Sequence, residues 1–216
     1  MGSRESQQDS CAVRDDQHGW LGVVCDGMSG YRENAAAARA ASAAFAGQWP
    51  PANESQVPAW MDESLIRAQS AVLDLSARAR LTPGVTGTTL LAAACAGEFL
   101  HWISAGDTSL FLLRDGLFEL LNILHIHERQ GSAPRSYLGS PEIREIDRSP
   151  SPLRLHPADL IVLASDGLTM AMPQEAIGDL LRKDPAIRPV DLIGHALAED
   201  RPAQDNITVI LVRVSG

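Results

Sequence analysis

The chain has 216 residues, 45% of them apolar and 21% charged, which is typical of a globular protein with a core of its own. Its formal net charge of −9 argues against nucleic acid and anionic membranes as partners, because both bind basic surfaces. The chain also lacks an apolar run long enough to cross a bilayer, so no membrane insertion is expected.

The cysteines are Cys11, Cys25 and Cys95, and all three lie in or beside apolar, strand-like runs. Their odd number and the absence of a Cys-x-x-Cys pair argue against a disulfide framework and against a zinc site. We interpret them as buried thiols in a reducing compartment, which indicates a cytoplasmic protein.

In chain order, the pattern predicts strands at 10–13 and 20–25, helices at 32–48 and 58–80, strands at 86–94, 99–104, 109–114, 117–121, 143–147, 153–155 and 159–164, helices at 173–183 and 189–199, and a last strand at 207–214. The stretch 32–48 is alanine-rich and ends at a double proline, and Pro58 is well placed to open the next helix. Glycine-containing turns near residues 97, 106 and 116 predict an antiparallel meander, and the polar residues 15–19 predict a hairpin turn. Residues 122–141 look irregular and predict a mobile loop.

This order does not alternate strand and helix, so it disfavours a doubly wound parallel sheet. It favours an α+β fold in which two antiparallel sheets pack face to face and a helix pair covers each outer face. We find no repeat or linker that would divide the chain, so residues 1–216 are expected to form a single domain.

Several acids share a position at the ends of predicted strands. They are Asp9 and Asp205 before strands, Asp26 and Asp166 after strands and before a glycine, and Asp107 in a turn. In an antiparallel sandwich, strand ends from distant parts of the chain meet at one edge. Crowded carboxylates raise one another's pKa and stay ionised most easily around cations, and oxygen ligands suit Mg²⁺ or Mn²⁺. Two such ions can activate a water for attack on phosphorus, and Arg4 would then grip the phosphate oxygens. Taken singly, each Asp-Gly is also explained as a turn, and Arg4 as a solvated side chain.

Six motifs occur in order along nearly the whole chain: Arg4-Glu5-Ser6-Gln7-Gln8-Asp9, Asp26-Gly27-Met28-Ser29-Gly30, Gly87-Thr88-Thr89, Gly106-Asp107-Thr108, Ser165-Asp166-Gly167-Leu168 and Asp205-Asn206. In this order they resemble the metal-dependent serine/threonine protein phosphatases of type 2C, and the style of the sequence resembles bacterial members. The resemblance implies a four-layer α-β-β-α sandwich and hydrolysis of phosphoserine and phosphothreonine in proteins that a serine/threonine kinase has phosphorylated.

The resemblance also implies site roles. Asp26 would bridge two Mn²⁺ or Mg²⁺ ions, the Gly27 carbonyl would bind one of them, and Asp166 and Asp205 would hold one ion. Asp9 would act mainly through metal-bound water, and Asp107 with Asp166 would hold a possible third ion. Arg4 would bind the substrate phosphate, the activated water would attack directly without a phospho-enzyme, and no cysteine would act as nucleophile.

The chain departs from the family pattern at several positions. Gln7 replaces an asparagine, Ser29 replaces a glycine, and Met28 stands where some members carry a histidine as general acid. His125 or His127 is then either a substitute acid or an ordinary loop histidine.

Two segments depart as well. The flap, about residues 122–141, is short, and Leu124 stands where the family often has an acid. The family's strand before the arginine is expected to be missing or truncated here, which leaves the anchoring of Arg4 open.

Two alternatives to an active phosphatase remain at this stage. One is a weak or inactive module of the same fold that binds a phosphoprotein or a regulatory partner. The other is a calcium-binding sandwich, although the sequence contains no Asp-x-Asp-x-Asp-Gly loop.

Overall fold

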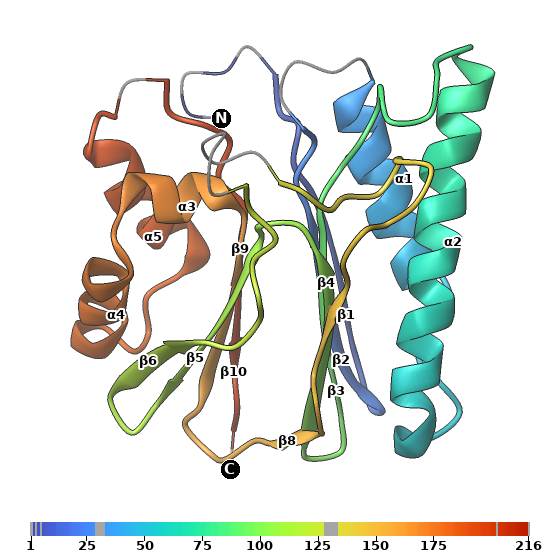
Figure 1. Cartoon of the computed structure of the whole chain (residues 1–216). Coiled ribbons are helices and arrows are strands. Elements are labelled where there is room, and N and C mark those ends of the chain that lie inside the picture. The colour runs from blue at the N-terminus through green and yellow to red at the C-terminus, as the bar shows by residue number, and fades with distance from the viewer. Residues whose placement is uncertain are drawn as a thin grey trace.

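The computed structural model describes residues 2, 4, 6–28, 33–127, 134–201 and 203–215. Two antiparallel sheets pack face to face, with helices on both outer faces, which confirms the expected four-layer α+β sandwich (Figure 1). One outer face is covered by α1 (Asn34–Ala46) and α2 (Val57–Arg78), and a short 3-10 turn, η1 (Glu54–Gln56), precedes α2. The other is covered by α3 (Asp166–Ala171), α4 (Gln174–Lys183) and α5 (Pro189–Ala198).

The first sheet has the order β1-β2-β3-β4, and β7 and β8 both pair with β4. Its strands are β1 (Ser10–Asp16), β2 (Gly19–Cys25), β3 (Leu90–Ala96), β4 (Phe99–Ala105), β7 (Asp147–Arg148) and β8 (Leu153–Arg154). The second sheet has the order β10-β9-β5-β6. Its strands are β5 (Ser109–Arg114), β6 (Leu117–Leu120), β9 (Leu160–Ala164) and β10 (Val209–Arg213).

Alternating side chains divide the core into three layers. Along β3, Leu90, Ala92 and Ala94 pack against α1 and α2, whereas Leu91 and Ala93 lie between the two sheets. The same alternation in β9 turns Val162 toward the outer helices and Ile161 and Leu163 toward the first sheet. Because successive strand residues point to opposite faces, fully apolar strands such as β3 and β9 are buried on both sides.

The strand register brings the ends of distant strands to one edge of the sandwich. Ser10 at the start of β1 pairs with Cys25 at the end of β2. Ala164 at the end of β9 pairs with both Ser109 and Val209, which begin β5 and β10. The loops that carry the predicted acids therefore leave the two sheets at the same end, at the top of Figure 1.

Three expectations about the elements are wrong. The meander does not continue from β4 to β5, because these strands belong to different sheets and the Gly106 turn crosses between them. Strand β3 begins at Leu90 rather than at residue 86. Strand β1 extends to Asp16, so the turn is shorter than 15–19, since the polar residues at 14–16 pair with 19–21.

Helix α3 and the environment of Cys11 also differ from expectation. The sequence predicted only two helices after β9, because a six-residue helix with a glycine in its first turn gives little periodic signal. Cys25 and Cys95 are buried as expected, but Cys11 is exposed, because its side of β1 faces solvent. The expected helix start at residue 32 lies outside the described residues.

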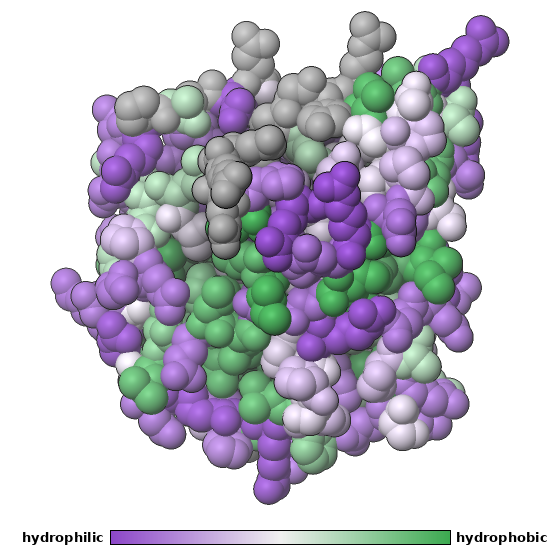
Figure 2. Space-filling view, viewed as in Figure 1, coloured by the Kyte–Doolittle hydropathy of each residue, from purple (hydrophilic) through white to green (hydrophobic). Residues whose placement is uncertain are grey.

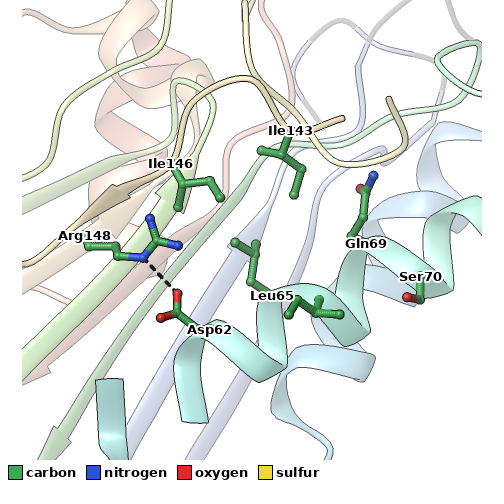
Figure 3. A pocket seen from close by; sticks show the side chains of 8 residues that line it. Asp62, Leu65, Gln69, Ser70, Ile143, Ile146 and Arg148 are labelled. Carbon is green, nitrogen blue, oxygen red and sulfur yellow. Dashed lines mark hydrogen bonds and ion pairs between the residues drawn. The ribbon is translucent and has the colours of Figure 1, made fainter. Parts of the chain in front are cut away.

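A pocket of about 450 Å³ lies between α2 and the segment before β7 (Figure 3). Leu65, Ile143 and Ile146 line it, and the Asp62–Arg148 ion pair, with 2.8 Å between Nε and Oδ1, crosses one side. None of the predicted site acids contributes to this pocket.

Apolar side chains also gather on the surface over β5 and β6 (Figure 2), where the Leu117 side chain is 64% exposed. This surface lies beside the start of the flap. Among the described residues, no helix has the length and apolarity that crossing a bilayer requires.

Candidate metal centre and phosphate site

Five acids at the edge described above form what we call the acid cluster: Asp9, Asp26, Asp107, Asp166 and Asp205. The structure brings together all five, because each exerts an electrostatic effect on the pKa of at least one other member. Asp9 and Asp107 are almost fully buried, and the other three are half-buried. Buried, mutually repelling carboxylates are costly unless protons or cations neutralise them.

Asp26 lies at the centre of this network. Its carboxyl and those of Asp166 and Asp9 influence one another's pKa. Burial, followed by the charge of Asp9, raises the pKa of Asp26 well above its ordinary value. Burial also raises the pKa of Asp166, although its interaction with the Asp26 carboxyl opposes that rise. The negative charge of Asp26 is therefore costly at this position unless a proton or a cation neutralises it.

Asp9 is fixed by two hydroxyl groups from the other sheet. Its Oδ2 accepts hydrogen bonds from Ser165 Oγ at 2.8 Å and from Thr208 Oγ1 at 2.7 Å. Ser165 Oγ in turn accepts from the Thr208 backbone N–H at 2.9 Å. Burial raises the pKa of Asp9, and the two hydroxyl donors partly offset this rise. Ser165 is the N-cap residue of α3, but its hydroxyl donates to Asp9 and does not cap the helix.

The backbone around Asp26 is held by two threonines that follow Gly87. The Asp26 carbonyl accepts from Thr88 Oγ1 at 2.9 Å and from the Thr89 N–H at 2.8 Å. The Asp26 N–H donates to Thr89 Oγ1 at 3.0 Å. A Cβ at Gly27 would lie 2.7 Å from the Gln8 carbonyl oxygen, so only glycine fits this position. The Gly-Thr-Thr motif thus supports the Asp26-Gly27 loop.

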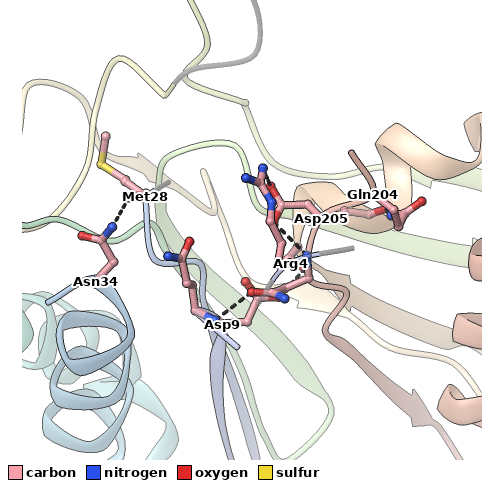
Figure 4. Close-up of polar contacts among 10 residues, drawn as sticks. Arg4, Asp9, Met28, Asn34, Gln204 and Asp205 are labelled. Carbon is pink, nitrogen blue, oxygen red and sulfur yellow. Dashed lines mark hydrogen bonds and ion pairs between the residues drawn. The ribbon is translucent and has the colours of Figure 1, made fainter. Parts of the chain in front are cut away.

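Arg4 and Asp205 bind each other (Figure 4). Arg4 Nε donates to Asp205 Oδ1 at 3.0 Å, and Nη2 donates to Oδ2 at 2.7 Å. Next to this pair, the Gln8 N–H donates to Asn206 Oδ1 at 2.7 Å, which ties the N-terminal motif to the loop before β10. The contact answers the question of how Arg4 is anchored: it rests on Asp205, with 38% of its side chain exposed.

Asp107 lies in the crossover from β4 to β5. Burial, and then the charge of Asp166, raise the pKa of Asp107 to about 7. The neighbouring Thr108 hydroxyl is hydrogen-bonded to the Thr89 hydroxyl at 2.8 Å, which joins this loop to the one that supports Asp26. Asp107 thus belongs to the same electrostatic unit, although it reaches the site from a different connection.

The donor chemistry of the cluster fits a hard divalent cation. All of its side-chain groups are carboxylates, and Asp166 Oδ1 is buried without a hydrogen-bond partner among the residues that the structure describes. Among the described residues, no three acid, histidine or cysteine side chains have the geometry of a formed metal site. Asp205 is instead bonded to Arg4, and Asp9 is bonded to Ser165 and Thr208, so binding a cation requires rearrangement of these side chains and release of any protons that the carboxyls hold.

The described residues of the flap, 122–127 and 134–141, are bonded to the sandwich. Leu138 and Thr88 exchange two backbone hydrogen bonds, of 2.9 and 3.1 Å. His125 is buried, and its Nδ1 accepts from the Gly106 N–H at 3.1 Å, so this nitrogen is engaged with the backbone. His127 is half-buried. Residues 128–133, together with Ser29 and Gly30 of the Asp-Gly loop, lie outside the described residues.

The sequence did not predict a supporting role for several residues that hold the site, and it offered His125 only as a substitute acid or an ordinary loop histidine. Ser165, Thr208, Asn122 and His125 all donate to or accept from the site loops. Thr208 follows Asn206 by two residues, and Ser165 directly precedes Asp166. Their adjacency to site acids was the one available signal, because short polar residues next to ligands commonly orient them.

Comparisons with known proteins identify the relatives of this chain. The family model described as Protein phosphatase 2C matches residues 2–211. A protein named serine/threonine phosphatase stp from Listeria welshimeri is 26% identical, with 88% of this chain and 82% of the relative covered. A putative protein phosphatase 2C-type from Streptococcus pyogenes is 25% identical, with 97% and 92% covered.

Solved structures show the same fold. The Mycobacterium tuberculosis serine/threonine phosphatase PstP/Ppp superposes with a TM-score of 0.84 at 24% identity, covering 100% of this chain and 95% of that one. The Streptococcus agalactiae serine/threonine phosphatase gives a TM-score of 0.83 at 24% identity, covering 99% and 96%. The fold and the clustered acids define a phosphatase of the four-layer sandwich class. The chain belongs to the protein phosphatase 2C family, the serine/threonine protein phosphatases that its motifs resemble.

Proposed function

We propose that the chain hydrolyses phosphoserine and phosphothreonine in proteins, with Mn²⁺ or Mg²⁺ bound at the acid cluster. The observation that supports this most is the convergence of five buried or half-buried carboxyls, from strand ends far apart in the sequence, on one edge of the sandwich. The raised pKa values and the unpartnered Asp166 Oδ1 are what a cation site presents when no cation neutralises it.

In this proposal Asp26 would help to hold both ions, and the Gly27 carbonyl would bind one of them. Asp166 and Asp205 each contribute a carboxylate, and Asp9 contributes through water. Bound ions would supply a water nucleophile at neutral pH and neutralise the phosphoryl oxygens. The role of the chain's own residues is to hold the carboxylates in place, and the hydroxyls of Ser165 and Thr208 do this for Asp9. Asp107, with Asp166, is proposed to hold a third, weaker ion.

Arg4 is proposed to bind the substrate phosphate. Its guanidinium presents two parallel N–H donors, the geometry that suits both carboxylate and phosphate. In the described structure these donors are used by Asp205. A phosphate would therefore compete with Asp205 for Arg4, while a cation competes with Arg4 for Asp205.

The proposed substrates are phosphoproteins, the products of a serine/threonine kinase. The negative net charge of the chain agrees with a cation-dependent site and not with a nucleic-acid surface. A cytoplasmic location and a single domain over residues 1–216 remain predictions from the sequence.

The test of this proposal is release of inorganic phosphate from a phosphothreonine peptide, with and without Mn²⁺. We expect release that depends on Mn²⁺, stops with EDTA and is much slower for a phosphotyrosine peptide. No release by folded protein at millimolar Mn²⁺ would overturn the proposal.

The alternative of an inactive binding module is favoured by one observation, the Arg4–Asp205 pair, which occupies both a proposed phosphate ligand and a proposed metal ligand. Isothermal titration separates the two functions. An inactive module would bind the phosphopeptide without Mn²⁺ and release no phosphate after Mn²⁺ is added.

A further inference from the structure

Two buried polar side chains of the flap, Asn122 and His125, bond to the crossover loop that carries Asp107. The Gly106 backbone N–H donates to the His125 ring nitrogen Nδ1 at 3.1 Å, and the His125 backbone N–H donates to the Gly106 carbonyl at 2.8 Å. His125 is 3% exposed and Asn122 is 4% exposed. The residue before Asp107 is therefore held on both of its backbone polar groups by a single histidine.

Asn122 holds the other side of the same loop. Its Oδ1 accepts from the Leu110 N–H at 2.8 Å, and its Nδ2 donates to the Thr108 carbonyl at 3.0 Å. The same Nδ2 lies 3.2 Å from Ser104 Oγ on β4. Asn122 and His125 thus bond to the chain on both sides of Asp107.

The crossover needs such bonds, because it passes from one sheet to the other. Residues 106–108 lie between β4 and β5, which do not pair with each other, so their backbone groups have no partners from a strand ladder between these strands. Gly106 has φ of +125°, and a Cβ at this position would lie 2.6 Å from the Thr89 Cβ. A buried loop without strand–strand hydrogen bonds keeps a fixed shape when side chains supply hydrogen bonds to its backbone groups.

We propose that His125 is a positioning residue for Asp107: through the Gly106 N–H, its Nδ1 fixes the direction in which the Asp107 carboxylate enters the acid cluster. Its contribution is geometric, and the ring does not transfer a proton to the leaving group. This inference rests on the proposed function, since it concerns the weaker ion assigned to Asp107 and Asp166.

The test compares two substitutions that differ in where they place an amide. In His125→Asn the side-chain oxygen falls at the distance of Nδ1 from the backbone and can accept from Gly106. In His125→Gln it falls one bond farther, at the distance of Nε2, and this acceptor is lost. Both replacements are polar, and neither side chain extends farther than histidine. A difference between the two variants therefore cannot be attributed to overpacking.

The measurement is Mn²⁺ binding by isothermal titration and electron paramagnetic resonance, which does not depend on turnover. Loss of an outer-shell hydrogen bond typically costs about 10–100-fold in metal affinity. We therefore expect His125→Gln to raise the Kd of the weaker ion by about tenfold or more, whereas His125→Asn stays within about twofold of wild type. His101→Leu is the matched control, because His101 on β4 is also 3% exposed, and its Nε2 has no hydrogen-bond partner in the described part of the chain. It should change stability but not Mn²⁺ binding.

A double-mutant cycle with Asp107→Asn completes the test. The weaker ion should be lost in Asp107→Asn, and adding His125→Gln should then change nothing further. Equal Kd values for the Asn and Gln variants would overturn the inference. So would a His125→Gln effect that persists without Asp107, or wild-type binding that Asp107→Asn leaves unchanged. These outcomes are distinguishable from failure of the proposed function, which would show as wild-type protein that releases no phosphate.

Discussion

Arg4 and Asp205, which lie 201 positions apart in the sequence, form an ion pair with two hydrogen bonds, of 3.0 and 2.7 Å. The pair joins the first motif of the chain to the last and closes the edge of the sandwich at which the acids meet. Arg4 is proposed to bind phosphate and Asp205 a cation. Substrate and metal would therefore each compete with the ion pair, the substrate for Arg4 and the metal for Asp205.

Replacing Arg4 by alanine should therefore have two opposite effects. Loss of charge-assisted hydrogen bonds, worth about 1.5–3 kcal/mol each, should raise the KM for a phosphopeptide by about tenfold or more. Loss of a partly exposed ion pair, worth about 0.2–1 kcal/mol, frees Asp205 and should tighten Mn²⁺ binding up to about fivefold.

Steady-state kinetics and isothermal titration measure the two effects of this substitution separately. Arg14→Ala, on the exposed side of β1, is the control and should change neither quantity. An Arg4→Ala variant with unaltered KM would contradict the assigned role.

Gly167 in α3 and Gly194 in α5 provide a matched pair of sites for testing how packing affects the free energy of unfolding. A Cβ at Gly167 would lie 1.9 Å from the Asn206 carbonyl oxygen, whereas a Cβ at Gly194 in α5 meets nothing within 4 Å. Gly167→Ala should therefore force apart α3 and the loop before β10, costing about 2 kcal/mol or more and weakening Mn²⁺ binding. Gly194→Ala should stabilise α5 by about 0.5–1 kcal/mol. Chemical denaturation of both variants checks the contrast, and equal effects would contradict this view of the α3 contact.

The stability of the metal-free protein should depend on pH through the acid cluster. The pKa of Asp107 is raised to about 7 by burial and by Asp166, and burial also raises the pKa of Asp9, Asp26 and Asp166. A raised pKa means that the folded state holds protons more tightly than the unfolded state, so this stability is present in acid and is lost as pH rises through the folded pKa.

In EDTA, the Tm should accordingly fall between about pH 5 and about pH 8. With Mn²⁺, the trend should reverse, because ionised carboxylates bind the cation and the stabilisation by metal grows with pH. The variant Asp107→Asn should flatten the EDTA curve. A Tm in EDTA that rises over this range would mean that the acids are not mutually desolvated as described.

The thiols should play no part in turnover. Cys25 and Cys95 are buried, and burial raises the pKa of Cys95 to about 11 and that of Cys25 still further, so neither forms a thiolate readily. Cys11 is exposed. Iodoacetamide should modify Cys11 alone in the native protein, and phosphate release should be unchanged. Mass spectrometry identifies the modified residue, and inactivation on alkylation would contradict a direct attack by water.

Much of the fold could be predicted from the sequence, because its elements have strong local signals. The alanine-rich α1, the apolar stripe of α2 and the doubly buried β9 follow from composition and periodicity. The path of β4 into β5 could not be predicted, because a glycine turn looks the same whether it closes a hairpin or crosses between sheets. Helix α3 was missed because six residues carry too little periodicity.

For the site, the acids could be predicted from the sequence, but the residues that hydrogen-bond to them and to their loops could not. An acid at the end of an apolar strand is visible in the sequence, as Asp26 and Asp166 show. The partners of these acids are set by the packing of the two sheets, which places Thr208 on Asp9 and His125 on Gly106. The pairing of Arg4 with Asp205 is likewise a property of the fold, and it shows how Arg4 is anchored, which the sequence left open.

The central claim is that these carboxylates hold the ions that make hydrolysis possible. The most direct measurement is Mn²⁺ binding by electron paramagnetic resonance, made on the same samples as phosphate release, for wild type and Asp166→Asn. We predict that wild type binds Mn²⁺ and releases phosphate in proportion to the bound ion, and that Asp166→Asn keeps the fold but loses both. Full Mn²⁺ binding and wild-type turnover in Asp166→Asn would contradict the claim.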